Sequence, residues 1–149
     1  MMKFSFGALI LIGIIAGSCS GSSKNEKEEF SLNNIEDIKT RQYAIAGRVL
    51  YQQLCANCHK DNGEGLGKLI PPLKNSDYMM QDISKTVQIL KNGISGKIMV
   101  NGIEYNQQMP ANPQLTNLEI AEITTYIYNV FGQKEILIDA NKVNQYLNQ

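Results

Sequence analysis

Cys55-Ala56-Asn57-Cys58-His59 is the stretch of this 149-residue chain around which the rest is organised. On one helical turn, two intervening residues leave both cysteine sulfur atoms on the same side. That separation is about the spacing of the two vinyl groups of a haem, and each sulfur can add to one vinyl as a thioether. His59 follows directly and can hold the iron from below the ring. The C-x-x-C-H pattern therefore predicts covalent attachment of one haem c.

Other interpretations of the cysteine pair fit the chain less well. A thioredoxin-like dithiol needs a surrounding βαβ pattern, which is not evident here. A zinc site needs four ligands, but the chain has one histidine and a single further cysteine, Cys19. A chance pattern is the remaining alternative, and it would not explain the motifs that follow.

The start of the chain has the features of an export signal. Lys3 precedes an apolar run over residues 4–16, which is too short to span a membrane comfortably. The run ends in Ala16-Gly17-Ser18-Cys19, which resembles a bacterial lipobox, and the resemblance implies a lipid on Cys19. An ordinary signal peptide is the alternative, but it would leave a lone reactive thiol. We expect residues 1–18 to be a lipoprotein signal peptide and the protein to be exported and anchored to a bacterial membrane, with its haem domain on the periplasmic or extracytoplasmic side.

The charge of the chain limits which partners it can bind, and its composition indicates where the folded domain begins. The chain has 14 basic and 14 acidic residues, and removal of Lys3 with the signal leaves a net charge near −1. This balance argues against nucleic acid as a partner. Serine, glycine and charged residues dominate residues 19–40, which we expect to be a flexible tether. Residues 41–149 then form one domain, with a core over 41–132 and a tail over 133–149.

Three further motifs follow the haem pattern and, together with it, identify a family. They are Ile70-Pro71-Pro72-Leu73, Met109-Pro110, and a last core helix that carries Tyr126. Over residues 41–132 the chain resembles the class I c-type cytochromes. The resemblance implies an all-α fold in which N-terminal and C-terminal helices cross around one covalent haem. It also implies that the Pro71 carbonyl accepts the second ring proton of His59 and that Leu73 packs on the haem.

Turn and capping signals predict the elements between these motifs. Asn101-Gly102 lies between two β-prone runs and predicts a small hairpin before the methionine loop. Thr116 and Glu119 form a T-x-x-E capping box, which starts a helix to about Phe131. Gly132 is expected to end this helix. Four further helices are predicted: one over 41–54, one from a cap at Asn75 to Met80, one over 83–92 and one from a cap at Asp139 to Leu147. Asp82 caps the helix over 83–92, and Gly93 ends it in a left-handed conformation.

Gly47 and Tyr51 lie on one face of the first predicted helix. A glycine inside a helix costs about 1 kcal/mol relative to alanine, so it needs a packing reason. The family resemblance supplies one, a close crossing with the last core helix at Tyr126, with Ile123 one turn earlier. A merely tolerated surface glycine is the alternative.

Met109 is the expected sixth ligand of the iron. A second histidine ligand is impossible within the chain, because His59 is its only histidine. Met79, Met80 and Met99 fall on a predicted helix or strand and are more simply core residues. Met109 precedes a proline, which favours an extended loop, and the family places its ligand before the last helix. Tyr105 and Asn106 are weaker candidates, either for lining the haem pocket or for bonding near the ligand.

These features together predict a one-electron carrier and not an enzyme. Methionine opposite histidine fills both axial positions and raises the potential. We expect a monomer that exchanges electrons with protein partners of a respiratory chain. Two alternatives remain open at this stage: a haem sensor or peroxidase-like enzyme with a labile Met109, and a haem subunit of a larger oxidase or dehydrogenase.

Overall fold

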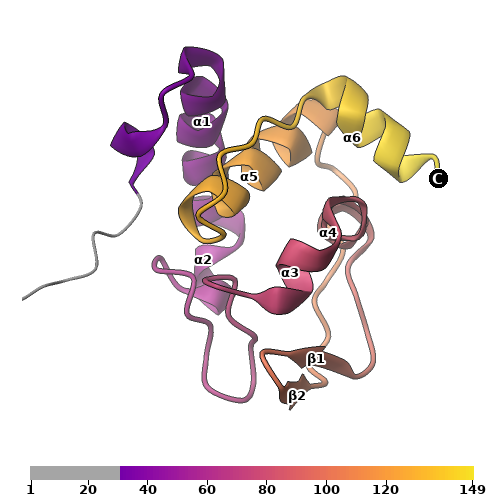
Figure 1. The fold of residues 1–149 in the computed structure, drawn as a ribbon. Coiled ribbons are helices and arrows are strands. Elements are labelled where there is room, and N and C mark those ends of the chain that lie inside the picture. Colours follow the sequence, from indigo (N-terminus) through magenta and orange to yellow (C-terminus); the bar gives the residue numbers. More distant parts are fainter. Residues whose placement is uncertain (1–30) are drawn as a thin grey trace, which may run out of the picture.

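Helices joined by loops, with one small antiparallel sheet, make up the part of the chain that the structure describes (Figure 1). A computed structural model describes residues 31–149, so the predicted signal peptide and Cys19 lie outside the described residues. The predicted all-α architecture with a small hairpin is confirmed. The elements are η1 (Leu32–Asn34), α1 (Ile38–Leu54), α2 (Ala56–His59), α3 (Asp77–Gln81), α4 (Ile83–Asn92), β1 (Ile98–Val100), β2 (Ile103–Tyr105), α5 (Asn117–Val130) and α6 (Ala140–Leu147).

The folded part begins earlier than the sequence suggests. Asp37 caps α1, and its side chain accepts a hydrogen bond from the backbone N–H of Thr40 at 2.7 Å. The Ile35 side chain is fully buried, which ties the segment before α1 to the fold. The predicted start of the domain at residue 41 is therefore too late, because apolar burial and a helix cap already order residues 31–40. Only residues 19–30 remain as a candidate tether.

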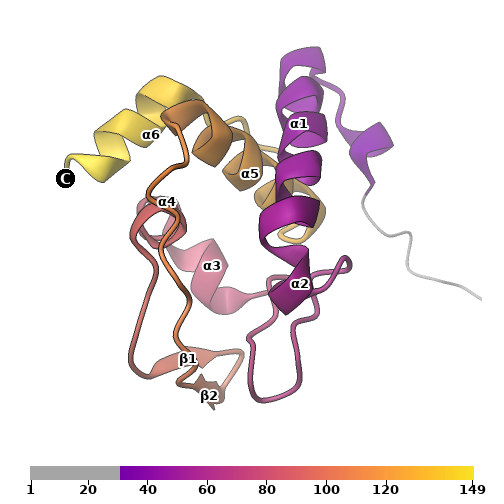
Figure 2. The ribbon, with the colours of Figure 1, turned by 180° about the vertical axis from the view of Figure 1, so that it is seen from behind.

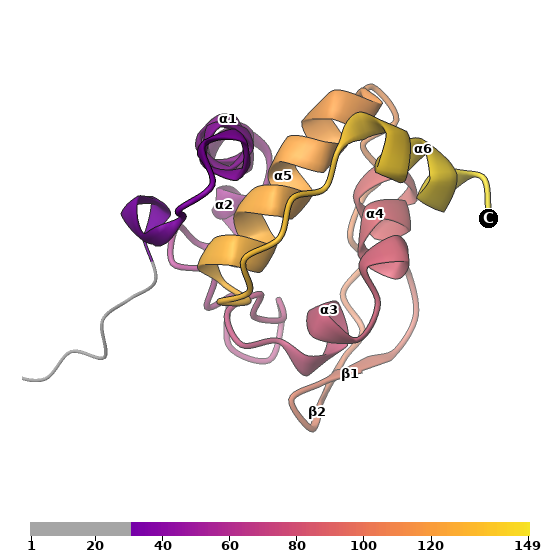
Figure 3. The ribbon, with the colours of Figure 1, turned by 45° about the horizontal axis from the view of Figure 1, so that its top comes forward.

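α1 and α5 cross closely, and this pair forms the main frame of the fold (Figure 3). Gly47 lies on the inner face of α1, where a Cβ atom would collide with the backbone carbonyl of Glu122 and would lie 2.9 Å from the Tyr126 Cβ atom. The helices can approach this far only because residue 47 has no side chain.

The segment from α3 to the hairpin follows the predicted turn chemistry with two differences. Ser76, not Asn75, caps α3, because Asn75 has a φ of 54° and lies before the helix. Gly93 does end α4, but its φ of 73° and ψ of −175° are not left-handed helical. At Gly93 the chain leaves the helix in an extended direction. The hairpin turn at Asn101-Gly102 has positive φ at both residues, as a tight hairpin turn requires.

α5 is the most deeply buried helix. Thr116 and Glu119 form the predicted capping box at its start. Its end differs slightly from the prediction, since Phe131 is the C-cap and the positive φ falls on Gln133 rather than Gly132. Nine of its residues are buried: Ile120, Ala121, Ile123, Thr124, Thr125, Tyr126, Ile127, Tyr128 and Asn129.

The tail folds back over the helices, in a position that the sequence did not predict. α6 packs against both α5 and α4 (Figures 1 and 2). The backbone N–H of Ile138 donates to Thr125 Oγ1 at 3.1 Å, and Gln88 Nε2 donates to the Tyr146 carbonyl at 3.1 Å. The tail thereby fixes α4 relative to α5 and supports one side of the site.

Candidate functional site

One largely apolar cavity lies between the helix frame and the hairpin side of the molecule. Its empty space is about 970 Å³ when the open mouth is included. α1, α2, α3, α4, α5, β1 and the loops before α3 and α5 all contribute to its walls. Four side chains that can bind a haem or its iron line this single cavity: Cys55, Cys58, His59 and Met109.

The two cysteines lie where α1 passes into α2. Cys55 is the C-cap of α1 and donates its backbone N–H to the Tyr51 carbonyl at 2.8 Å. The His59 N–H in turn donates to the Cys55 carbonyl at 2.9 Å, so the C-x-x-C-H stretch is one helical turn. Burial raises the pKa of Cys55 to about 11, with a smaller contribution from Cys58. Both cysteines line the cavity.

His59 is buried, with 9% of its surface exposed, and has a defined backbone partner. Its Nδ1 atom lies 3.1 Å from the carbonyl oxygen of Pro71. A carbonyl only accepts, so this hydrogen bond places a proton on Nδ1 and leaves the Nε2 lone pair free. Burial lowers the pKa of His59, and the Pro71 bond opposes that shift. The imidazole is therefore held in the neutral, metal-binding form.

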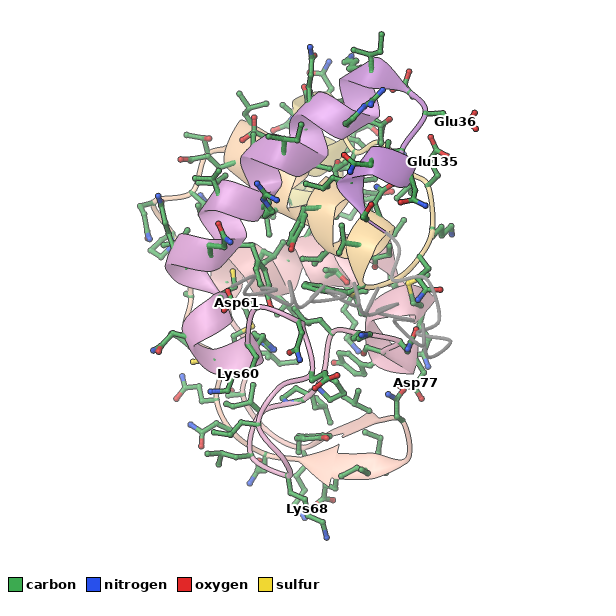
Figure 4. The ribbon with its side chains drawn as sticks, turned by 90° about the vertical axis from the view of Figure 1, so that its left-hand side faces the viewer. Glu36, Lys60, Asp61, Lys68, Asp77 and Glu135 are labelled. Atoms are coloured by element: carbon green, nitrogen blue, oxygen red, sulfur yellow. The ribbon has the colours of Figure 1, made fainter. Side chains whose placement is uncertain are left out.

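A glycine-rich loop brings Pro71 to His59. The Gly65 N–H donates to the His59 carbonyl at 3.0 Å, and the loop then turns back through paired hydrogen bonds between Leu66 and Ile70. A Cβ atom on Gly65 would lie 2.7 Å from the Pro71 oxygen. Figure 4 shows the loop from its start at Lys60 and Asp61, directly after α2, to its far tip at Lys68.

Three aromatic rings pack together beside the helix crossing, and of these only the Tyr51 ring lines the cavity. Tyr51, Tyr126 and Phe131 pack with ring centroids 5.2 to 5.4 Å apart. The Tyr51 hydroxyl donates to the Lys60 carbonyl at 2.6 Å and so ties the start of the loop to α1. Tyr51 and Ile123 line the cavity. The sequence did not predict that Phe131 packs on these two tyrosines, since an apolar residue at a helix end is its only signal.

The Met109 backbone is fixed by a two-way bridge to Ile94. Ile94 N donates to the Met109 carbonyl at 3.0 Å, and Met109 N donates to the Ile94 carbonyl at 2.9 Å.

Met79 also lines the cavity, but it lies on α3 and belongs to the hydrophobic core. Met99 is 55% exposed on β1 and so is not the core residue that the sequence suggested.

Among the weaker candidates, only some reach the cavity. Leu73 lines it, as the family resemblance implied. Tyr105 and Asn106 do not line it: the Tyr105 hydroxyl instead donates to the Gly67 carbonyl at 3.4 Å, and Asn106 is exposed. The two glutamines that follow, Gln107 and Gln108, line the cavity in their place, because the chain turns toward α4 only after the hairpin ends.

The residues present fit a haem. The walls are dominated by aliphatic side chains, which suit the apolar faces of a macrocycle. Two thiols one helical turn apart, a neutral imidazole and a thioether are the donor set that attaches and ligates haem c. Apolar wall residues include Ile70, Leu73, Ile89, Leu90, Ile98 and Ile127.

Comparison with known proteins places the chain in a family. The Cytochrome c family model matches residues 44–131, which is more than half of the chain. The chain belongs to the cytochrome c family, whose members carry covalently attached haem c and transfer electrons. Cys55, Cys58 and His59 provide the attachment spacing of that family.

Two curated relatives share this similarity. One cytochrome c-552 of Thermus thermophilus is 33% identical over 103 residues, which cover 65% of this chain and 72% of the relative. A second cytochrome c-552, from a named strain of the same species, is also 33% identical over 103 residues, which cover 65% of this chain and 64% of the relative. Among residues 31–149, no helix is both long and apolar enough to cross a membrane.

Proposed function

We propose that this protein is a membrane-anchored, single-haem electron carrier whose iron is held by His59 and Met109. One observation carries the proposal: a buried histidine and a loop methionine line the same apolar cavity as the two attachment cysteines. Haem c, when bound, supplies an iron that takes up and gives back one electron. Protein partners of a respiratory chain supply and accept that electron.

His59 and Met109 have distinct roles. His59 donates its Nδ1 proton to the Pro71 carbonyl, which orients the ring and makes Nε2 a better ligand. The thioether of Met109 would hold the iron together with His59, which would leave no open place for a substrate. Methionine as the partner of histidine raises the potential.

The cavity walls favour electron exchange over bond making. Aliphatic side chains keep water away from the iron and limit the rearrangement that accompanies a change of charge. The segment 70–73, α4 and α5 all contribute to these walls. The protein then acts as a monomer that meets its partners in turn.

Anchoring is the part of the proposal that concerns the chain before residue 31. The lipobox-like sequence at Cys19 supports lipidation and export, which would place the haem domain on the extracytoplasmic side of a bacterial membrane. Eleven residues separate Cys19 from Ser31, and such a segment reaches at most about 40 Å. The carrier would therefore work close to the membrane surface.

A matched pair of variants tests the ligand assignment. Met109→Leu and Met79→Leu each replace a thioether by a side chain of similar volume. Absorption spectra of the oxidised and reduced protein, with a haem stain after denaturing electrophoresis, show attachment and ligation. We expect only Met109→Leu to lose the methionine–iron(III) band and to lower the potential.

The opposite result would overturn the proposal. If Met79→Leu loses the band and Met109→Leu keeps it, Met79 is the ligand. If the unmodified protein lacks the band and binds added cyanide rapidly, it is a sensor or peroxidase-like enzyme with a labile methionine. Stable co-purification with other subunits would indicate a component of a larger complex.

A further inference from the structure

The end of α4 and the loop that carries Met109 are joined by a series of polar contacts. We call residues 106–115 the Met109 loop. The Ile94 bridge holds the loop at Met109 itself, with hydrogen bonds of 3.0 and 2.9 Å. The remaining contacts all hold the part of the loop after Met109, between the ligand and α5.

Lys91, in the last turn of α4, is the first of these contacts. Its ammonium group donates to the carbonyl of Pro113 at 2.8 Å and to the carbonyl of Leu115 at 2.6 Å. Hydrogen bonds from a charged donor are shorter and stronger than neutral ones. One partly buried side chain thus holds two carbonyls of the turn that runs from Asn112 to Leu115.

Asn112, in the Met109 loop, donates hydrogen bonds back to the same end of α4. Its backbone N–H donates to the Lys91 carbonyl at 3.1 Å, and its Nδ2 donates to the Leu90 carbonyl at 3.2 Å. The last carbonyls of a helix have no partner within the helix. Asn112 supplies donors to two of these carbonyls, so the hydrogen bonds that the helix end lacks come from the loop.

Gly93 makes this close approach possible. A Cβ atom at this position would lie 2.5 Å from the Met109 oxygen and 2.7 Å from the Ala111 nitrogen. Its φ of 73° is also one that other residues rarely adopt. The backbone at the end of α4 therefore packs directly against the backbone of the Met109 loop.

We propose that Lys91 and Asn112 are positioning residues that keep Met109 on the iron, and this inference rests on the proposed function. A methionine side chain has three rotatable bonds and gains little from a single bond to iron unless its backbone is already in place. With the loop tied to α4 at Met109 and beyond it, the thioether returns to the iron faster than another ligand can enter. Loss of either residue's contacts lets the loop open and exposes the iron.

The test measures how fast Met109 leaves the iron. The haem-loaded oxidised protein is mixed with rising concentrations of imidazole, and at saturation the rate equals that of methionine dissociation. We expect this limiting rate to rise about tenfold in Lys91→Ala and in Asn112→Ala, as expected when a hydrogen bond to a charged or buried group is lost. Lys97→Ala, on an exposed lysine of the hairpin side, and Asn92→Ala, on the exposed last residue of α4, are matched controls and should stay near the wild-type rate.

A second readout separates positioning from general stability. Amide hydrogen exchange of Met109, measured by NMR on the reduced protein, should accelerate in Lys91→Ala and Asn112→Ala, while amides of α1 and α5 stay protected. Exchange that accelerates uniformly over the chain would show a merely structural role and overturn the inference. If Lys91→Ala does not accumulate, Lys91→Gln, which retains a neutral N–H donor, replaces it and should give an intermediate rate.

A Met109→Ala variant distinguishes failure of this inference from failure of the ligand assignment. Without a methionine to displace, imidazole binding should show no saturating rate. A saturating rate in Met109→Ala would overturn the assignment of Met109 and the positioning roles with it. Saturation lost in Met109→Ala, with unchanged limiting rates in Lys91→Ala and Asn112→Ala, would overturn the positioning roles alone.

Discussion

The carbonyl of Pro71 stands beside Gly65 so closely that a Cβ atom on Gly65 would lie 2.7 Å from the Pro71 oxygen and 2.8 Å from its carbon. The same oxygen lies 3.1 Å from Nδ1 of His59. The missing side chain of Gly65 thus determines where the partner of His59 can lie. A loop glycine and an axial ligand are linked through one carbonyl group.

Gly65→Ala should therefore move that carbonyl, and Gly67→Ala is its matched control. Both glycines have positive φ, 70° and 52°, so each substitution costs about 1–2 kcal/mol of backbone strain. Nothing lies within 4 Å of a Cβ atom on Gly67, so only Gly65→Ala adds a collision, first with the Ile70 oxygen and then with the Pro71 carbonyl. We expect a weaker His59 hydrogen bond, a less basic imidazole and a higher midpoint potential in Gly65→Ala alone. Equal potentials in the two variants would contradict this link.

Gly47→Leu should push α1 and α5 apart. Overpacking of a core contact typically costs about 1–3 kcal/mol, although leucine has the higher helix propensity. Gln42→Leu places the same side chain on the exposed side of α1 and should leave the melting temperature nearly unchanged. Thermal unfolding followed by circular dichroism measures both. A similar melting temperature for the two variants would mean that the crossing can relax around a side chain at position 47.

Glu119→Gln should change how stability depends on pH. Hydrogen bonds from the backbone and side chain of Thr116 lower the pKa of Glu119 below its ordinary value of 4.5. A carboxyl whose pKa is lower in the folded state than in the unfolded state stabilises the fold at every pH above the unfolded-state pKa. That contribution is lost as the pH falls through the folded-state pKa. The melting temperatures of wild type and variant should therefore differ at neutral pH and converge in acid. A difference that persists in acid would show that the charge is not the cause.

Local signals in the sequence are sufficient to predict several parts of the structure. Asn101-Gly102 predicts its turn because both residues tolerate positive φ, and Thr116 predicts its helix start because a hydroxyl can cap a free N–H. The haem pattern at Cys55 is equally local. Each of these features depends on residues within one turn of the chain, which is why a single sequence displays them.

The rest of the site depends on contacts between distant residues. Lys91 and Pro113 are 22 positions apart, and no property of a lysine near a helix end shows which carbonyls it will reach. The packing of Phe131 against Tyr51 and the approach of Gly93 to Met109 are likewise consequences of the assembled fold. The prediction that Tyr105 lines the cavity is wrong for the converse reason, since proximity to Met109 in sequence does not bring Tyr105 to the cavity.

Cys19→Ser tests the proposed anchor. Lipid chains contribute about 0.8 kcal/mol for each buried methylene, and two acyl chains are enough for stable anchoring. The variant should be made with a cleavable signal peptide, and cells separated into membrane and soluble exported fractions. We expect the haem-bearing protein to move into the soluble fraction with an unchanged absorption spectrum, because Cys19 lies outside the haem domain.

The absorption spectrum and the cell fraction report on different parts of the chain, so the outcomes of Cys19→Ser can be told apart. Haem stain in the soluble fraction with a normal spectrum would show that the protein folds and attaches haem without the lipid. Protein that stays in the membrane pellet after a high-salt wash would exclude Cys19 as the anchor. The apolar run of residues 4–16 or a tightly bound membrane partner would then have to hold it. A Ser18→Ala variant, which keeps Cys19 and a small residue before it, should remain with the membrane and serves as the control for changes near the cleavage site.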